Sequence, residues 1–419
     1  MNKIDLRPQR SLESTAPAAS RRRTLALLGG VALAASPWCR SVTAEASMAA
    51  PASVTRFAAP EREEAVLRID SSTDTVLFAP AIRDFQRLHP SVTVWYADRQ
   101  SLDMHARALA FAAAARSGSA LGRPEIAVPE DAPDLIISSS PDLQTQLAND
   151  GLAWGHQSPQ TRELPEGAHW RREVFTLGAD AVVMAYNPRL LPVAQVPRTR
   201  GQLLALLRQP GSPLQGRIGM YDATRSGLGY LLATQDSRFD STASVLLAAM
   251  GEAGVRLGDH IEPLLDRLEK GELALVYNVP ASYPLARMDA GASLRVVVPE
   301  DYTLLTTRVA LIPTTAPHPE KARPFLDYLL SPQGQAVLAR DTRLLPVRQA
   351  VAAARDGRAL ALPGRVGAAS ALSAASAEVA PGSSAWRLLS PGLGLLAYLD
   401  PLKRQRFLQA WATSVQPRK

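Results

Sequence analysis

Cysteine is almost absent from this chain of 419 residues, which has only Cys39. A lone cysteine can form no disulfide within the chain and no thiolate metal site. Catalytic signatures are missing too: there is no G-x-S-x-G elbow, no H-E-x-x-H helix and no P-loop. The six histidines lack metal-ligand spacing: His89, His105, His156, His169, His260 and His318. We therefore predict no cofactor, no metal and no enzyme activity, and keep an enzyme as the weaker alternative.

No apolar run near the N-terminus is long enough to span a membrane. The run "TLALLGGVALAAS" has about a dozen residues, whereas a membrane helix needs about 20. Arg21–Arg23 precede it and the small residues "VTAEASMAA" follow, which is the order of a secretory signal. Ser20–Leu25 also looks like a twin-arginine signal. We predict that residues 1–46 are removed and that the protein is periplasmic. The alternatives are a basic tail that is retained, and export by the general secretory route.

Two further features restrict the class of protein. Trp38 before Cys39 does not suit lipoprotein acylation, so we expect no lipid anchor. The formal charge is +7, but residues 1–46 hold seven Lys and Arg against three acidic residues, which leaves about +3. That is too little to indicate nucleic-acid or membrane binding. With 46% apolar and 20% charged residues, the composition is that of a globular protein with about two domains.

The chain alternates strand-like and helix-like segments. "AVLRID", "SVTVWYAD" and "APDLIISSS" read as strands, and 75–88 and 101–116 read as helices, the first with apolar residues at helical spacing and with Asp74 placed to cap it. The pattern restarts at Ala181 with "AVVMAYN", and a helix opened by Thr199 follows. Alternation of this kind predicts an α/β fold with mostly parallel strands.

Hydroxyl-bearing residues cluster where two of these strands end, at 71–73 and 138–140. A third junction, "YDATRSGLGY", places Thr224–Gly227 between a strand and a helix. Ligands of open α/β sheets lie outside the carboxyl ends of strands, and anions bind at helix N-termini. We predict a ligand site at these junctions. Ordinary N-capping and a β-turn are the structural alternatives.

Several longer segments resemble the extracellular solute-binding proteins of bacterial ABC importers. They are "SSTD", "FQRLHPSVTVWY", "AVVMAYNPRLL", "GELALVYNVPASY" and "IPTTAPHPEKARPFLDYLLSPQGQAVLA". Within that superfamily they are similar to the type 2 branch of ferric, phosphonate and phosphoglycerate-type binding proteins. The ending "LLAYLDPLKRQRFLQAW" resembles the phosphoglycerate-transport-regulatory subgroup.

The resemblance implies a two-lobed α/β protein, with a hinge crossed twice and a ligand cleft between the lobes. Residues 66–180 would form the first part of lobe 1, 181–302 would form lobe 2, and 303–419 would return to lobe 1 and end in C-terminal helices. We expect a monomer. Its partner would be the permease of an ABC transporter or, as an alternative, the periplasmic domain of a sensor histidine kinase.

The resemblance also implies ligand-binding roles. Thr224–Gly227 would contact an anion, and the turn from Asn278 to Tyr283 would face the cleft. Tyr302 and Thr303 precede the return crossing. The predicted ligand-binding residues are Ser71, Ser72, Thr73, Ser138, Ser139, Ser140, Thr224, Arg225, Ser226, Gly227, Asn278, Tyr283, Tyr302 and Thr303.

Some residues keep two readings. Arg225 would counter the ligand's charge or lie solvated beside Asp222. Asp180 would cap a helix or line the hinge, and Trp154 and Trp170 would stack on a ligand or pack in the core.

The sequence departs from ferric members of that branch. A single tyrosine, Tyr283, follows Asn278 where such members carry adjacent tyrosines, and the loop at 71–74 has no histidine. Fe(III) prefers several anionic oxygen ligands, and the sequence shows too few of them for the cleft. We therefore predict a metal-free organic anion bearing phosphate, phosphonate or carboxylate. A ferric-ion-binding protein is the second alternative, after the sensory one.

Overall fold

The computed structural model describes residues 53–120, 129, 131–356 and 385–416. The chain divides into two units, residues 1–48 and 49–419, and every described residue belongs to the second unit. The predicted signal and most of the Ala-, Gly- and Ser-rich segment 354–381 lie outside the described ranges. Within those ranges, no helix combines the length and apolarity that crossing a membrane requires.

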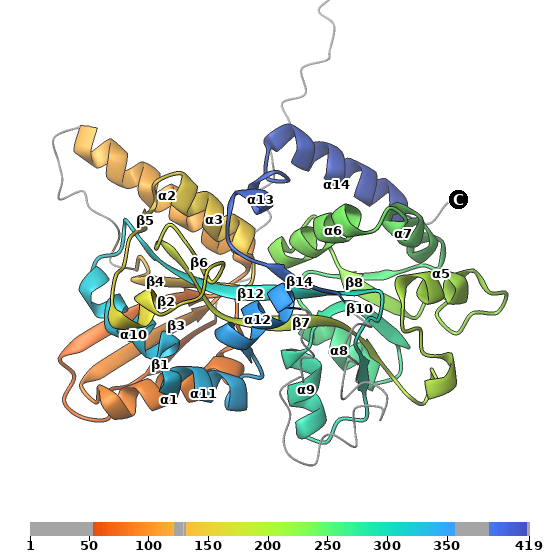
Figure 1. The fold of residues 1–419 in the computed structure, drawn as a ribbon, viewed down its shortest axis with the longest axis horizontal. Coiled ribbons are helices and arrows are strands. Elements are labelled where there is room, and N and C mark those ends of the chain that lie inside the picture. Colours follow the sequence, from red (N-terminus) through yellow and green to blue (C-terminus); the bar gives the residue numbers. More distant parts are fainter. Residues whose placement is uncertain (1–52, 121–128, 130, 357–384, 417–419) are drawn as a thin grey trace, which may run out of the picture. The chain divides into compact units, whose positions relative to one another are not determined.

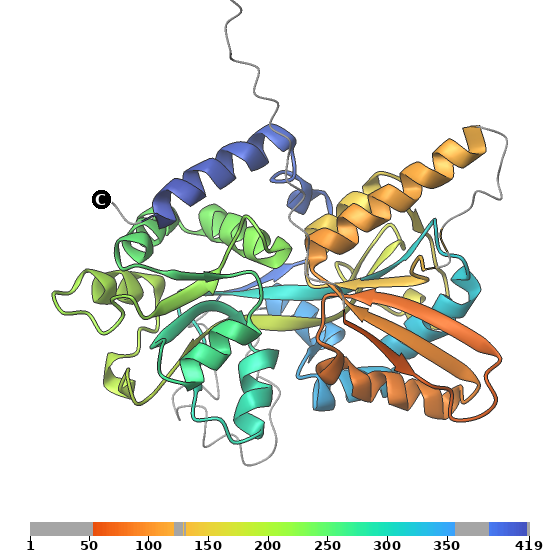
Figure 2. The same ribbon diagram turned by 180° about the vertical axis from the view of Figure 1, so that it is seen from behind.

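Lobe 1 is built on the parallel strand order β3-β2-β4, with β1 antiparallel at the edge beside β3 (Figure 1). Figure 2 shows these strands in red and orange beside helix α1. The strands are β1 (Ser53–Phe57), β2 (Ala65–Ser71), β3 (Val92–Asp98) and β4 (Leu135–Ser138). The helices are α1 (Thr75–Leu88), α2 (Ser101–Ala120), α3 (Pro141–Asn149), α4 (Pro159–Arg162), α10 (Pro319–Leu330) and α11 (Pro332–Asp341).

Lobe 2 repeats the arrangement, with the parallel strand order β10-β8-β9. Its strands are β8 (Ile218–Tyr221), β9 (Arg256–Gly258), β10 (Leu275–Pro280) and β11 (Arg295–Val297). Its helices are α5 (Arg200–Arg208), α6 (Gly227–Phe239), α7 (Ala243–Glu252), α8 (Glu262–Glu269) and α9 (Ser282–Asp289), after a short 3-10 turn, η1 (Val193–Gln195).

Two long strands, β7 (Val174–Tyr186) and β12 (Tyr302–Pro313), join the lobes. They pair antiparallel with each other, and every residue of both is buried. The prediction of mostly parallel strands is therefore wrong for the sheet as a whole. β12 runs antiparallel to β4 and β7 runs antiparallel to β10, because each hinge strand carries the chain back across its lobe.

The remaining short elements lie along the hinge strands or follow them in the chain. β5 (Ala153–Trp154) and β14 (Ala385–Leu389) pair with β12, and β6 (His169–Trp170) and β13 (Leu345–Pro346) pair with β7. The helices are α12 (Val347–Asp356), α13 (Leu393–Leu396) and α14 (Pro401–Val415). The predicted C-terminal helix is confirmed as α14.

Local sequence signals explain several of these elements. α1 spans the predicted residues and buries Phe78, Ile82 and Phe85 on one face. Thr199 caps α5, with its hydroxyl accepting a hydrogen bond from Gln202 N at 3.1 Å. β7, in contrast, begins at Val174 and not at Ala181. The preceding segment Thr176–Asp180 contains Thr, Gly and Asp and so lacks a strand pattern, but it pairs with the buried strand β12.

α14 lies across α6 and α7 in both views (Figure 1, Figure 2). The contact with α7 depends on Gly251, where an added Cβ would lie 2.1 Å from the carbonyl oxygen of Ser414 and 3.0 Å from Cα of Val415. Both obstacles are backbone atoms, so no side-chain rotation relieves the clash. Only glycine lets the two helices approach this closely.

We predict that Gly251→Ala lowers the free energy of unfolding by about 1–3 kcal/mol, because overpacking forces α14 away from α7. The matched control is Gly394→Ala in α13, where an added Cβ meets nothing within 4 Å. Urea unfolding of both variants and the wild type measures the difference. Equal stability of the two variants would show that α14 docking tolerates the extra methyl group.

Candidate ligand-binding cleft

A polar cavity lies where the strand ends of lobe 1 face the helix starts of lobe 2. β2, β3, β4 and β8 all end at or beside it, as expected for a ligand site of an α/β sheet. Its lining residues are Ser72, Asp74, Asp98, Arg99, Gln100, Ser101, Ser139, Tyr221, Ser226, Leu228, Asp259, His260, Ile261, Glu262, Tyr283 and Arg308. Both lobes thus supply its walls.

In each of the two hydroxyl clusters, one serine stabilises a turn and the next serine lines the cavity. Ser71 and Ser138 are fully buried, and their hydroxyls accept hydrogen bonds from Thr73 N and Ser140 N, both at 3.1 Å. These bonds hold the turns after β2 and β4. Ser72 and Ser139 line the cavity instead, with their hydroxyl oxygens 3.1 Å apart.

Thr73 and Ser140 lie just behind this wall. The Thr73 hydroxyl contacts the guanidinium of Arg308, and its carbonyl accepts a hydrogen bond from Tyr96 Oη at 2.6 Å. The Ser140 hydroxyl is buried and has no hydrogen-bond partner among the described residues.

The helix start on the opposite wall is closed by Ser226. Its hydroxyl accepts a hydrogen bond from Gly229 N at 3.1 Å, so Ser226 is the N-cap of α6 as well as a lining residue. Thr224 bonds to Asp222 at 2.8 Å through its backbone N–H, and Arg225 pairs with Asp259 at 2.7 Å. Arg225 is thus paired with Asp259, and neither it nor Thr224 is among the lining residues.

Gly227 brings the lobes into contact. A Cβ added there would lie 3.1 Å from each of three lobe 1 side chains, those of Ser101, Ser140 and Leu143. Such contacts are tighter than ordinary packing allows, so a glycine lets α6 approach the start of α3 closely. The residue serves the approach of the two lobes.

Three predicted residues lie away from the lining. Asn278 and Tyr302 donate hydrogen bonds to the Asp236 carboxylate, at 2.6 and 2.7 Å, and Arg200 pairs with Asp236 at 3.2 Å. The Thr303 hydroxyl donates to the carbonyl of Pro299 at 2.7 Å. Asn278 adopts φ +54°, a left-handed conformation that Asn tolerates better than most residues.

Tyr283 does line the cavity, beside a cation that the sequence analysis missed. Arg308 in β12 is buried and hydrogen-bonded to Tyr283. Burial raises the pKa of Tyr283 well above its usual 10, and Arg308 opposes that rise. Burial alone would lower the pKa of Arg308, but Tyr283 and Asp180 reverse the effect and keep it charged. Nε of Arg308 has no hydrogen-bond partner among the described residues. A lone arginine in a buried strand was the available signal.

Three interacting carboxyl groups also line the cavity, and we call them the acidic wall: Asp74, Asp98 and Glu262. Asp74 is hydrogen-bonded to both Asp98 and Glu262. Burial, followed by the charge of Asp74, raises the pKa of Asp98 from 3.8 to about 7. Burial raises the pKa of Glu262 above its usual 4.5, and so does the hydrogen bond that its protonated form donates to Asp74. Asp74 takes the N-cap position of α1, but its side chain makes no capping bond there, so the predicted cap is wrong.

The structure also corrects an argument that the sequence analysis made against iron. That argument assumed too few anionic oxygen ligands in the cleft. Four carboxyl groups line the cleft together with Tyr283, which is more than the sequence analysis had located there: those of Asp74, Asp98, Asp259 and Glu262. Within the described residues, no three His, Cys, Asp or Glu side chains are grouped so that they could hold a metal ion.

Three other residues with two readings can be placed. Asp180 accepts a hydrogen bond from Ser282 N at 3.0 Å at the start of α9, which is the capping role. Trp154 is 47% exposed, Trp170 is half-buried, and neither is among the lining residues.

Solved structures share this architecture. A substrate-binding protein of an ABC transporter from Agrobacterium tumefaciens is 27% identical, with a TM-score of 0.72 over 88% of this chain and 100% of that one. Iron-bound HitA from Pseudomonas aeruginosa is 16% identical (TM-score 0.58; 84% and 99% covered). AfuA from Actinobacillus pleuropneumoniae, with fructose-6-phosphate bound, is 15% identical (TM-score 0.60; 84% and 99% covered). The last two likenesses show the fold alone.

No curated protein matches the chain. The family of bacterial extracellular solute-binding proteins matches residues 78–341, which is more than half of the sequence. This chain belongs to that family, whose members bind solutes and are not enzymes.

Proposed function

We propose that this protein captures a small zwitterionic solute in the periplasm and delivers it to the permease of an ABC transporter. One observation carries the ligand class: Arg308 and the three carboxyl groups of Asp74, Asp98 and Glu262 line the same cavity. The similar Agrobacterium tumefaciens protein belongs to an ABC transporter, which favours a permease over a sensor kinase as partner.

The acidic wall favours a positively charged group on the ligand. Burial, and after it the neighbouring Asp74, disfavours ionisation of Asp98 and Glu262 and raises their pKa values. An ammonium group placed among the three carboxyl groups would stabilise their ionised forms and lower their pKa values again. Oxygen Oε1 of Glu262 is buried without a hydrogen-bond partner among the described residues, so it has an acceptor site to offer such a group.

Other lining residues favour a negatively charged group, as the sequence analysis proposed for the whole ligand. Arg308 offers its unpartnered Nε–H, and Ser72 and Ser139 offer hydroxyls. Ser226 stands at the N-terminus of the 13-residue helix α6, where the helix dipole is positive. The acid group of the ligand is therefore expected beside Arg308 and these serine hydroxyls. The ammonium group of the ligand is expected at the acidic wall.

Two other lining charges leave this balance unchanged, because each is already paired. Nε of Arg99 lies 3.1 Å from a carboxylate oxygen of Asp70, and Asp259 pairs with Arg225 at 2.7 Å. The charges left to face a ligand are those of Arg308 and of the three carboxyl groups.

A panel of amino acids and aminoalkyl phosphonates tests the ligand class. Each compound is compared with two analogues, one lacking the ammonium group and one lacking the acid. We expect only doubly charged compounds to raise the melting temperature, because ligand binding to the native state stabilises it. If the analogues without an ammonium group raise it equally, the ligand is a simple anion and the acidic wall has no role in selection.

Two substitutions assign the walls, with the best compound of that panel as ligand. Arg308→Gln should weaken binding by about ten- to a hundredfold, because a charge-assisted hydrogen bond contributes about 1.5–3 kcal/mol. Glu262→Gln should instead reduce discrimination against the analogue lacking an ammonium group. Arg198→Gln is the control, since Arg198 pairs with Glu300 at 3.1 Å and neither residue lines the cavity. Calorimetry that finds all three variants binding like the wild type would refute this site.

The acidic wall also predicts how stability depends on pH without ligand. The folded-state pKa of Asp98 is raised to about 7, so folding favours its protonated form. The stabilisation is complete below the unfolded value near 3.8 and is lost as the pH rises towards 7. The wild type should therefore be less stable at pH 8 than at pH 5, and Asp98→Asn should reduce that loss. Urea unfolding at both pH values measures it; an identical loss in Asp98→Asn would contradict the prediction.

A further inference from the structure

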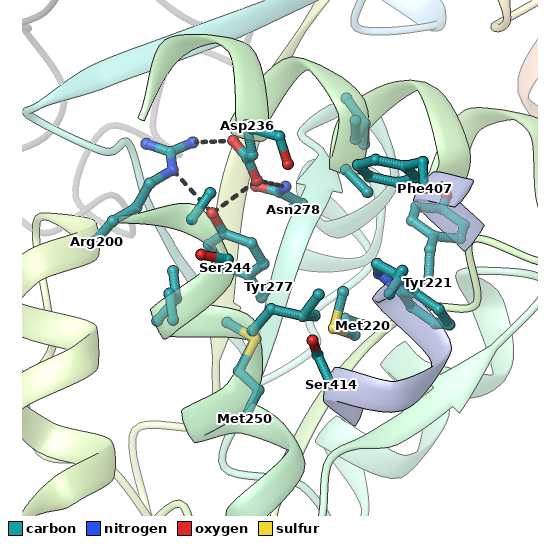
Figure 3. Close-up of a pocket in the computed structure, with 18 of the residues that line it drawn as sticks. Arg200, Met220, Tyr221, Asp236, Ser244, Met250, Tyr277, Asn278, Phe407 and Ser414 are labelled. Carbon is teal, nitrogen blue, oxygen red and sulfur yellow. Dashed lines mark hydrogen bonds and ion pairs between the residues drawn. The ribbon is translucent and has the colours of Figure 1, made fainter. Parts of the chain in front are cut away.

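A second cavity of about 240 Å³ lies inside lobe 2, beneath α14 (Figure 3). Three helices each present one face to it at helical spacing. α6 contributes Gly229, Leu232, Ala233 and Asp236, α7 contributes Ala243, Leu246, Leu247 and Met250, and α14 contributes Phe407, Ala410, Trp411 and Ser414. These residues recur every three or four positions, so each helix has a single face turned towards the space between them.

The space that remains is large for a protein interior. Native cores are packed as densely as organic crystals, and an engineered apolar cavity of about 150 Å³ in another protein binds benzene. The α14 cavity exceeds that volume. It differs from the cleft because α6 meets the cleft through its N-terminus and the cavity through its side.

The walls select an aromatic ring. Met220 and Met250 lie together on one side of the cavity, and Phe407 and Tyr221 lie on another (Figure 3). Thioether sulfur and aromatic rings both make favourable contacts with a ring placed between them.

The polar groups of the lining determine the ligand's charge. Of the described lining residues, only Arg200 and Asp236 carry charge, and they pair at 3.2 Å. Asp236 also accepts hydrogen bonds from Tyr277 at 2.9 Å and Asn278 at 2.6 Å, as the dashed lines in Figure 3 mark. The charges of Arg200 and Asp236 are paired with each other, so the lining calls for no charge on a ligand.

Two buried donors of the lining have no hydrogen-bond partner among the described residues: Nη2 of Arg200, which lies 3.2 Å from Asp236 in their ion pair, and Nε1 of Trp411. Trp411 is 2% exposed, and its Nε1 is buried without a hydrogen-bond partner among the described residues. An indole N–H can only donate, and an unpaired buried donor is costly. A ligand with a hydrogen-bond acceptor would provide the missing partner.

We propose that the α14 cavity is a second ligand site, which binds a small neutral aromatic molecule carrying one hydrogen-bond acceptor. Exposed Ser237, Ser244 and Ala410 at its margin form the entrance. The proposal is independent of what the cleft binds, although Tyr221 lines both cavities.

Acetophenone, which has one ring and one carbonyl acceptor, is the probe, and toluene is its matched analogue without an acceptor. In the full chain labelled with [¹³C-methyl]methionine, acetophenone should shift the resonances of Met220 and Met250. Those of Met104 and Met288, which are not among the lining residues, should stay in place. Equal shifts of all four resonances would overturn the proposal, because they indicate non-specific partitioning.

Trp411→Phe keeps the ring and removes the N–H donor. It should weaken acetophenone binding about two- to tenfold while leaving toluene binding nearly unchanged. Ala233→Leu, which adds volume to the cavity from a half-buried helix position, should weaken both probes. Ser139→Ala alters the cleft alone and should change neither. The proposal fails if Trp411→Phe affects both probes equally, or if Ala233→Leu folds normally and binds both like the wild type.

Discussion

The burial of Arg308 is the constraint on which the rest of the cleft depends. A guanidinium removed from water must find partners, and those of Arg308 come from both lobes: Thr73 after β2 and Tyr283 in α9. Asp180 on the neighbouring hinge strand supplies compensating charge and holds the start of α9 through Ser282. One buried cation therefore fixes the end of a lobe 1 strand and the start of a lobe 2 helix against the same hinge.

The three carboxyl groups of the acidic wall differ from Arg308, because the protein does not stabilise their charged forms. Tyr283 and Asp180 keep Arg308 charged, whereas burial and the neighbouring Asp74 raise the pKa values of Asp98 and Glu262, so these two groups hold protons at pH values where free carboxyl groups are ionised. Such a cluster stores unfavourable electrostatic energy at neutral pH, and a positively charged group of a ligand releases it. Selectivity for an ammonium group, as proposed for the ligand, would then arise from repulsion in the empty site as much as from attraction in the filled one.

Elements with strong local signals could be predicted, and residues defined by contacts far along the chain could not. The spacing of Phe78, Ile82 and Phe85 was enough for α1, and Thr199 for the start of α5. Ser72, Ser139 and Ser226 were found because strand ends and helix starts are visible in the sequence, and the structure places them in one cavity.

Arg308 could not be predicted as a cleft residue, because its partner Thr73 is 235 positions away in the sequence. Asn278 and Tyr302 were assigned to the cleft with the resemblance as guide, whereas in the structure both are hydrogen-bonded to Asp236 outside its lining.

Helix α6 connects the two cavities through its glycines. Gly227 lets its first turn approach lobe 1, and Gly229 lets the same turn lie against Tyr221, where an added Cβ would be 2.6 Å from that of Tyr221. The Tyr221 side chain in turn lines both the cleft and the α14 cavity. Because packed interiors respond to small displacements as units, a molecule seated beneath α14 that moves Tyr221 also moves the wall next to Glu262. A ligand in lobe 2 would then bias capture in the cleft, and by thermodynamic reciprocity a solute in the cleft would change affinity beneath α14 by the same factor.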